Sequence, residues 1–451
     1  QALVMLTLSL GPHICAHGVL AISLCLCFKY CSSKQGCKAS YKPAVTKFAD
    51  YSGAPTSATS SGPPSGSPDE WVGQAFTLAE NQYHGCRGLG GRYWEVAMHT
   101  GEYLKSLRLV GEEPASGPST AEDLMARLDA LPSFILIGVC APALCEHADI
   151  RELVWPRYTA GFLLLEFVLP PPEPWEFQAR ELALWSDLHL DFVIAGVCSC
   201  GTTSLRKNLL QHPDIGFTVD GEDSWFTRHS RSLPYRDEVE QFNRAWLDRG
   251  RRIPRIKGLA GPSLFEDART RRVVSRMPQL RIITIICDPV GRIEKAMWTH
   301  HLCRGGDRPV GGRPCWPSLS AVLAAPEGEA LLAREIMGQR LQTLFALVGQ
   351  RAQLLHQDSL RLSPQSTYSA LAAFLGAGPF PPSMMFRRYN SQRGHRSELC
   401  RNTSLLAYLQ ERLHVEYSTF VELLRAANLS VPAALRLRHT RCDRPEELAG
   451  A

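Results

Sequence analysis

Lysine is the scarce charged residue of this chain. Of its 451 residues 49 are Lys or Arg, but only nine are lysines, and five of these lie between residues 29 and 47. The formal net charge of +5 therefore comes almost wholly from arginine. Such a mild basic excess suits an anionic ligand and equally suits an indifferent surface, and we expect no nucleic-acid partner.

Cysteine is abundant, but one spacing is missing. The chain has 15 cysteines, and no two of them form a CxxC pair. That pair is typical of zinc sites and of dithiol redox motifs. We therefore expect disulfides formed in a secretory compartment, and no metal. Two glycosylation sequons, which begin at Asn402 and Asn428, agree with that setting.

Charge is absent from the first segment. Residues 1–28 contain no Asp, Glu, Lys or Arg. Because about 20 apolar residues suffice to cross a bilayer, this segment predicts a transmembrane anchor or, alternatively, a signal segment. Residues 29–69 follow as a basic and then Ser/Gly/Pro-rich linker with few apolar side chains.

Residues 70–175 predict a small cysteine-containing module. Cys86, Cys140 and Cys145 are its candidates for disulfide bonds. The phrase "GVCAPALC" (138–145) resembles the N-terminal extracellular domain of nose-resistant-to-fluoxetine-type proteins. The alternative is a disulfide-stabilised module without chemistry of its own.

From residue 188 to residue 430 the pattern is that of an α/β fold. The runs "LDFVIAGV" (190–197) and "LRIITIIC" (280–287) are rich in Ile and Val, as expected of buried parallel strands. Helical patterns follow each run, and the helix expected near 367–376 ends in a glycine. Alternation of this kind predicts a parallel sheet flanked by helices, with residues 431–451 as a C-terminal tail.

A glycine-containing loop follows the first of these strands. In "GVCSCGTTSLRKNLLQHPDI" (196–215) two glycines precede a helix that starts with Thr202, Thr203 and Ser204. Such a turn exposes backbone N–H groups at a helix N-terminus, where the helix dipole also favours an anion. The Walker A motif continues with Lys-Ser/Thr after its last glycine. This chain does not, so a kinase or ATPase is disfavoured.

The loop resembles the 5′-phosphosulfate loop of sulfotransferases, "GxxKxGTTxLxxxLxxHP". Two later segments agree in order: "GEDSWFTRHS" (221–230) and "LRIITIICDPVGRIEKAMWTHHL" (280–302), the second of which is similar to the family's 3′-phosphate motif. Within the carbohydrate sulfotransferases, the chain most resembles the N-acetylgalactosamine 4-sulfate 6-O-sulfotransferase type. The resemblance implies a P-loop-like sulfotransferase fold and the co-substrate 3′-phosphoadenosine 5′-phosphosulfate (PAPS).

The chain departs from the family at important positions. Ser199 stands where the resemblance implies a catalytic lysine, Cys287 where it implies an arginine, and Lys295 where it implies a serine; Arg292 is retained. Loss of one donor to developing charge typically costs about 2.7–4 kcal/mol of transition-state stabilisation. The resemblance assigns cofactor binding to Cys198, Ser199, Cys200, Gly201, Thr202, Thr203, Ser204, Cys287, Arg292 and Lys295.

Glu222 matches the family's catalytic glutamate. Its carboxylate would accept the proton of the attacking hydroxyl, and Asp223 is the nearest alternative. Weaker candidates for catalysis or glycan contacts are His300, His301, Arg228 and Arg304. Sequence alone also suggests two disulfides, Cys303 with Cys315 and Cys400 with Cys442.

Two functions remain open at this point. The first is transfer of a sulfuryl group from PAPS to a hydroxyl of a glycosaminoglycan-like carbohydrate, by a Golgi or secretory enzyme whose catalytic domain is lumenal. The second is a catalytically impaired homologue that binds nucleotide or an anionic glycan. Lysines at the start of the linker favour a cytoplasmic flank, which conflicts with the lumenal placement and leaves the orientation open.

Overall fold

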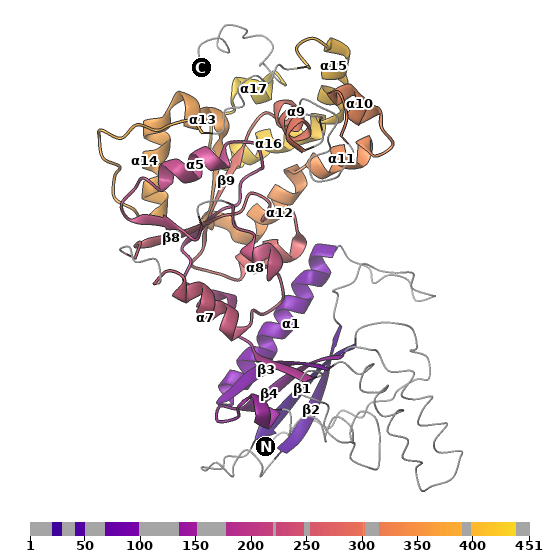
Figure 1. Ribbon diagram of the computed structural model, residues 1–451, viewed down its shortest axis with the longest axis vertical. Coiled ribbons are helices and arrows are strands. Elements are labelled where there is room, and N and C mark those ends of the chain that lie inside the picture. The colour runs from indigo at the N-terminus through magenta and orange to yellow at the C-terminus, as the bar shows by residue number, and fades with distance from the viewer. Residues whose placement is uncertain are drawn as a thin grey trace. The chain divides into compact units, whose positions relative to one another are not determined.

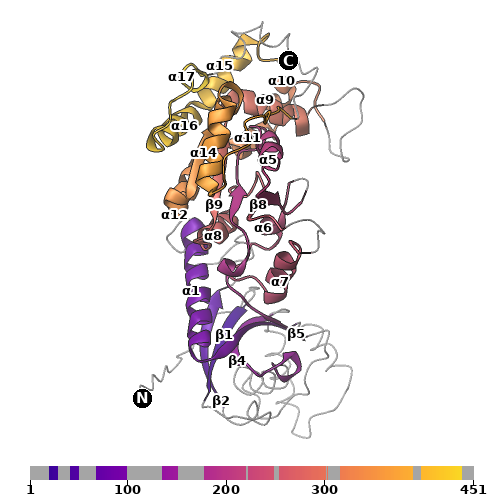
Figure 2. The ribbon, with the colours of Figure 1, turned by 90° about the vertical axis from the view of Figure 1, so that its left-hand side faces the viewer.

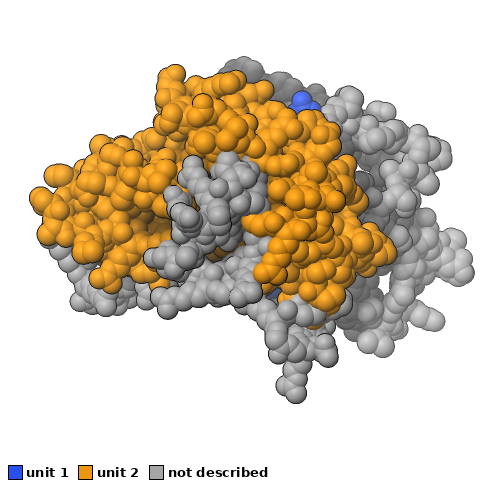
Figure 3. All heavy atoms as spheres, turned by 90° about the horizontal axis from the view of Figure 1, so that it is seen from above, with its two compact units in different colours: residues 1–184, 233–237 blue, residues 185–232, 238–451 orange. Residues whose placement is uncertain are grey.

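A computed structural model describes residues 20–28, 41–49, 68–98, 135–150, 177–219, 222–247, 253–300, 302, 315–389 and 398–438. The chain divides into two compact units, which Figure 3 distinguishes by colour. Unit 1 comprises residues 1–184 and 233–237, and unit 2 comprises residues 185–232 and 238–451.

Unit 1 is built on a mixed five-stranded sheet with the order β2-β1-β4-β3-β5 (Figure 1). Its strands are β1 (Leu20–Phe28), β2 (Tyr41–Ala49), β3 (Gly91–Met98), β4 (Ile135–Pro142) and β5 (Phe177–Glu181). The long helix α1 (Pro68–Gly88) packs on β3. This arrangement buries one helix face against the sheet and forms a small core.

The core of unit 1 contains a disulfide and two tyrosines. Cys86 at the end of α1 is bonded to Cys140 in β4, and both are buried. The rings of Tyr83 and Tyr93 meet edge to face, with centroids 6.5 Å apart. Cys145 is also disulfide-bonded. The expected small disulfide-containing module is thus present.

Two strands of unit 1 occupy segments for which the sequence predicted no sheet. β1 lies at the end of the apolar segment 1–28, and β2 lies within the expected linker 29–69. β1 pairs in parallel with β4 and antiparallel with β2, so pairing across the sheet decides its conformation. Among the helices of the described residues, none combines the length and the apolar character that a membrane crossing requires.

Unit 2 contains a five-stranded sheet in which every pair is parallel. Its order is β10-β9-β6-β8-β7. The strands are β6 (Phe192–Ile194), β7 (Ile215–Phe217), β8 (Ile256–Ala260), β9 (Arg281–Ile286) and β10 (Ala352–His356). β6 and β9 fall within the two apolar runs and are almost entirely buried, as expected of central strands of a parallel sheet.

Helices cover this sheet (Figures 1 and 2). α5 touches α14 through a hydrogen bond from Asn208 to Tyr368, whereas α12 packs on α8 and α16. α14 ends at Gly376 in the left-handed conformation, as its sequence predicted. The α/β fold with a parallel sheet flanked by helices is confirmed. The helices are α5 (Thr202–Leu209), α6 (Trp225–Arg228), α7 (Arg236–Arg244), α8 (Ala268–Ser275), α9 (Pro289–His300), α10 (Leu319–Ala324), α11 (Gly328–Glu335), α12 (Gly338–Val348), α13 (Gln357–Leu362), α14 (Pro364–Leu375), α15 (Thr403–Arg412), α16 (His414–Ala426) and α17 (Ala433–Arg436).

The strand order places a topological switch point at β6. The chain first runs from β6 to β7 and β8 on one side, and then crosses to β9 and β10 on the other. The connections that leave the carboxyl ends of β6 and β9 therefore diverge. Ligands of open parallel sheets bind in the crevice that such divergence creates.

Candidate anion-binding site

The glycine-containing loop lies at this switch point. Ala195 and Val197 still donate to carbonyl groups of β9, at 2.9 and 3.0 Å, so the loop begins as an extension of the sheet. A Cβ on Gly196 would come within 2.6 Å of the Ile285 side chain, and the site therefore requires glycine. The loop then turns through two left-handed residues, Ser199 with φ 68° and Gly201 with φ 107°.

The turn delivers the N-terminus of α5 to the carboxyl edge of the sheet. Gly201 is the N-cap, and no side chain forms a cap hydrogen bond there. Helix N-termini carry a partial positive charge and outward N–H groups, which suit an anion. Thr202 is buried, and the Ser204 hydroxyl contacts the backbone of Tyr389 at 2.9 and 3.2 Å. The Ser204 hydroxyl therefore also holds a neighbouring segment against α5.

A disulfide joins the loop to the next strand. Cys200 is bonded to Cys287, which directly follows β9, and their Cα atoms are 5.3 Å apart. Exposure of these cysteines is 0% and 4%. Both were predicted to bind the cofactor, but their side chains form a covalent bridge. Only their backbone groups remain for a ligand.

Lys295 brings a positive charge to the loop. It extends from α9, and its Nζ donates a hydrogen bond of 3.0 Å to the backbone carbonyl of Ser199. Ser199 occupies the position where the sequence resemblance implies a lysine. An ammonium group therefore lies next to that position, although it comes from a different element.

Arg292, which was predicted to bind the cofactor, forms an ion pair within the protein. Its side chain has no exposed surface and pairs with Glu335, with Nη1 and Oε2 2.6 Å apart. A second nitrogen donates to the Glu335 carbonyl. The guanidinium group thus holds the end of α11 against α9, a role that the sequence did not indicate.

Several carboxylates act on the loop. Burial, together with the charges of Glu222, Glu266 and Glu335 and against the opposing charge of Arg292, raises the pKa of the Cys198 thiol to about 11. A half-buried thiol with this pKa is uncharged at neutral pH, so Cys198 is a poor nucleophile. The same interactions place Glu222 near the loop.

The two candidate bases differ in their contacts. Asp223 donates its N–H to Ala260 at 2.7 Å, which places this segment at the carboxyl end of β8. Its carboxylate accepts a hydrogen bond of 2.8 Å from the N–H of Trp225 and so caps α6. Because the Asp223 carboxylate already accepts a hydrogen bond from the backbone, Glu222 is the better candidate for a base.

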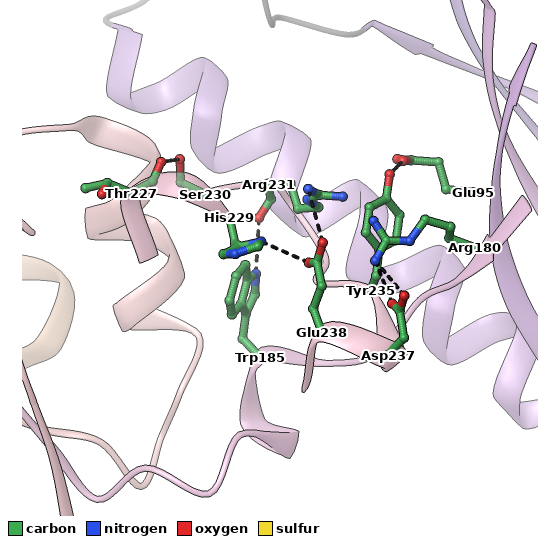
Figure 4. Close-up of polar contacts among 10 residues, drawn as sticks. All are labelled: Glu95, Arg180, Trp185, Thr227, His229, Ser230, Arg231, Tyr235, Asp237 and Glu238. Carbon is green, nitrogen blue, oxygen red and sulfur yellow. Dashed lines mark hydrogen bonds and ion pairs between the residues drawn. The ribbon is translucent and has the colours of Figure 1, made fainter. Parts of the chain in front are cut away.

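The segment after Glu222 is fixed by aromatic and ionic contacts within unit 2, and Figure 4 shows the polar ones among Trp185, His229, Arg231 and Glu238. The Trp225 ring lies edge to face with Trp185, and the Trp185 indole donates to the Arg231 carbonyl at 3.1 Å. His229 pairs with Glu238 at 3.2 Å. These contacts hold the Glu222 segment in place. Figure 4 also shows pairs of unit 1, including Arg180 with Asp237.

The remaining predicted residues lie only in part among the described residues. Arg228 is the exposed last residue of α6. Cys315 and Cys400 are disulfide-bonded, but Cys303 and Cys442 lie outside the described residues, so the two suggested pairings stay predictions. The side chain of His300, and all of His301 and Arg304, also lie outside them.

Two further observations concern metal ions and cavities. Within the described ranges, no group of His, Cys, Asp and Glu side chains is arranged to hold a metal ion. A cavity of about 300 Å³ is lined by Asp191, Arg255 and Arg281, which lie at the amino-terminal ends of the strands. That cavity is therefore at the edge of the sheet opposite to the loop.

No protein-family model and no curated protein matches the chain. Among solved structures it is similar to a sulfotransferase from Alicyclobacillus acidocaldarius, with 19% identity and a TM-score of 0.42 over 55% of this chain and 99% of that one. It is also similar to the sulfotransferase domain of the curacin biosynthetic pathway (13%, TM-score 0.29, 43% and 76% covered). A mouse sulfotransferase complexed with PAP is a third (14%, TM-score 0.26, 44% and 63% covered).

Proposed function

We propose that unit 2 transfers a sulfuryl group from PAPS to a hydroxyl of a carbohydrate acceptor of the glycosaminoglycan type. One observation carries the proposal. The switch-point loop combines the N-terminus of α5, two left-handed residues and the Lys295 ammonium group at the Ser199 carbonyl. This combination suits the phosphate groups of a nucleotide.

PAPS supplies the sulfuryl group when it is bound. As the acceptor oxygen bonds to sulfur, the bond from sulfur to the bridging oxygen breaks, and its electron pair stays on the departing phosphate. Lys295 and the first N–H groups of α5 stabilise that developing charge. Glu222 takes the proton of the attacking hydroxyl. Each role belongs to a residue at the carboxyl edge of the sheet.

The second candidate is a homologue that binds nucleotide or glycan without turnover. One specific observation favours it. Arg292 is paired with Glu335, and Glu222, Glu266 and Glu335 all act on Cys198. This surplus of carboxylates weakens the positive potential that a bisphosphate needs. Binding is then expected to be weak and transfer slow.

We also propose a secretory, Golgi-type location. The disulfides Cys86–Cys140 and Cys200–Cys287 support it, because such bonds persist in oxidising compartments. Attachment to a membrane through residues 1–28 stays a prediction, as does the anionic nature of the glycan.

The test uses the full chain and the variants Lys295→Ala and Lys207→Ala. Calorimetry measures binding of adenosine 3′,5′-bisphosphate, and labelled PAPS measures transfer to chondroitin and heparan. Loss of the Lys295 charge should lower transfer by about 100- to 1,000-fold. Lys207 is the matched control, because its ammonium group lies over the Tyr389 ring, 4.7 Å from its centroid.

The outcomes separate the two candidates. Transfer that needs Lys295 but not Lys207 supports the enzyme. Binding without transfer, with transfer appearing in Ser199→Lys, supports the impaired homologue. An unmodified chain that neither binds the bisphosphate nor transfers sulfate would refute the enzyme and a nucleotide-binding homologue, and would leave only glycan binding.

A further inference from the structure

The Cys200–Cys287 bridge lies inside the proposed phosphate loop. Cys200 is placed between the two left-handed residues Ser199 and Gly201. Cys287 directly follows β9, the strand that pairs with β6. The bridge therefore ties the turn to the neighbouring strand at the point where the loop leaves the sheet.

The shape of this loop needs support. Glycine adopts a positive φ readily, but a residue with a Cβ does so at a cost, and Ser199 has φ 68°. Three contacts hold it: the disulfide at the next residue, the hydrogen bond from Lys295 to the Ser199 carbonyl, and a backbone hydrogen bond of 3.2 Å from Cys200 to the Val197 carbonyl. The covalent contact cannot dissociate in the way that a hydrogen bond can. When it is cut, the turn is free to relax and the first N–H groups of α5 lose their alignment.

We infer that Cys200 and Cys287 are positioning residues of the anion-binding loop, so that affinity for a nucleotide bisphosphate depends on the oxidation state of this pair. The inference rests on the proposed function. The oxidised pair holds the loop in its binding shape, and the reduced pair releases it.

The redox step balances with a dithiol as reductant. One thiolate of the dithiol attacks a sulfur of the bridge and forms a mixed disulfide, and the other protein sulfur leaves as a thiolate. The second thiol of the reductant then displaces the remaining protein sulfur and closes its own disulfide. Two electrons and two protons pass to Cys200 and Cys287. Cys198 does not compete as an internal nucleophile, because it stays protonated near neutral pH.

The experiment compares the full chain with two double variants. Cys200→Ala/Cys287→Ala removes the bridge of the loop. Cys86→Ala/Cys140→Ala removes the Cys86–Cys140 bridge of unit 1 and serves as the matched control. Binding of adenosine 3′,5′-bisphosphate is measured by calorimetry across a series of dithiothreitol redox buffers. Circular dichroism shows that each sample remains folded at the temperature used.

The affinity of the unmodified chain should fall at least about tenfold on reduction and return on reoxidation. The redox midpoint of this loss of affinity should coincide with the midpoint for reduction of the Cys200–Cys287 bridge. Alkylation and peptide mass spectrometry measure the second midpoint. The loop variant should have the low affinity in every buffer, and the control should titrate like the unmodified chain. Equal affinity in oxidised and reduced protein, or a midpoint that follows another disulfide, overturns the inference.

A second measurement separates this inference from the proposed function. Hydrogen exchange of peptides from residues 195–204 reports the loop without any ligand. Faster exchange in Cys200→Ala/Cys287→Ala, with no bisphosphate binding even to the oxidised chain, would leave the positioning role intact and refute the proposed ligand. Unchanged exchange would refute the positioning role itself.

Discussion

Glu335→Gln removes one partner of a buried ion pair and leaves the other in place. The Arg292 side chain has 0% exposure and that of Glu335 has 21%, so the guanidinium group has no access to compensating water. Breaking a buried pair in this way typically costs about 3–5 kcal/mol of unfolding free energy. Glu335 is partly exposed, and its carbonyl still accepts from Arg292 in the variant. We therefore expect Glu335→Gln to cost about 3 kcal/mol of unfolding free energy, the lower end of this range.

This loss of unfolding free energy should lower the Tm. A domain of about 150–250 residues changes its Tm by about 2–4 °C per kcal/mol, so Glu335→Gln should lower the Tm of unit 2 by roughly 6–12 °C. Differential scanning calorimetry measures it. Glu329→Gln is the matched control, because Glu329 pairs with Arg412 at the surface and its side chain is 60% exposed. Its Tm should hardly change.

A double variant checks the cause. If the destabilisation comes from an unpaired buried charge, Arg292→Met in the Glu335→Gln background should restore part of the lost Tm. A Glu335→Gln variant as stable as Glu329→Gln would refute the argument. In that case Arg292 would not depend on Glu335 and would be available to a ligand.

Two further predictions concern pH. Burial lowers the pKa of His356. The contribution of His356 to stability is therefore present above about pH 6.5 and is lost as the pH falls through the lowered pKa. His356→Asn should flatten the fall in urea midpoint between about pH 7 and pH 5. Burial raises the pKa of Glu416, although N–H groups of Met337 and Gly338 oppose the shift, so stability present below about pH 4.5 is lost as pH rises through the raised pKa. Glu416→Gln should reduce that loss, again read from the urea midpoint, and an unchanged pH profile in either variant would contradict the assignment.

The parallel sheet of unit 2 could be predicted because its signals are local. β6 and β9 are continuous apolar runs, and Gly201 and Gly376 mark the start of one helix and the end of another. Each of these features depends on neighbours within about ten residues. The loop that carries the candidate site was predictable for the same reason.

The contacts within the site could not be predicted in this way. Fifteen cysteines allow many pairings, and only the order of β6 and β9 in the sheet brings Cys200 to Cys287. Similarly, nothing in the sequence near Glu335 indicates that its carboxylate would form an ion pair with Arg292. The strand β1 was missed because its parallel partner β4 lies far along the chain.

The central position of β6 has a consequence for biosynthesis. This strand leaves the ribosome before β8 and β9, the two strands that flank it, and Cys287 follows Cys200 by 87 positions. Contacts of such long range slow folding, because the intervening chain must be ordered first. The nascent protein therefore carries an uncovered apolar strand for a prolonged period, and a chaperone together with a disulfide isomerase should increase its yield.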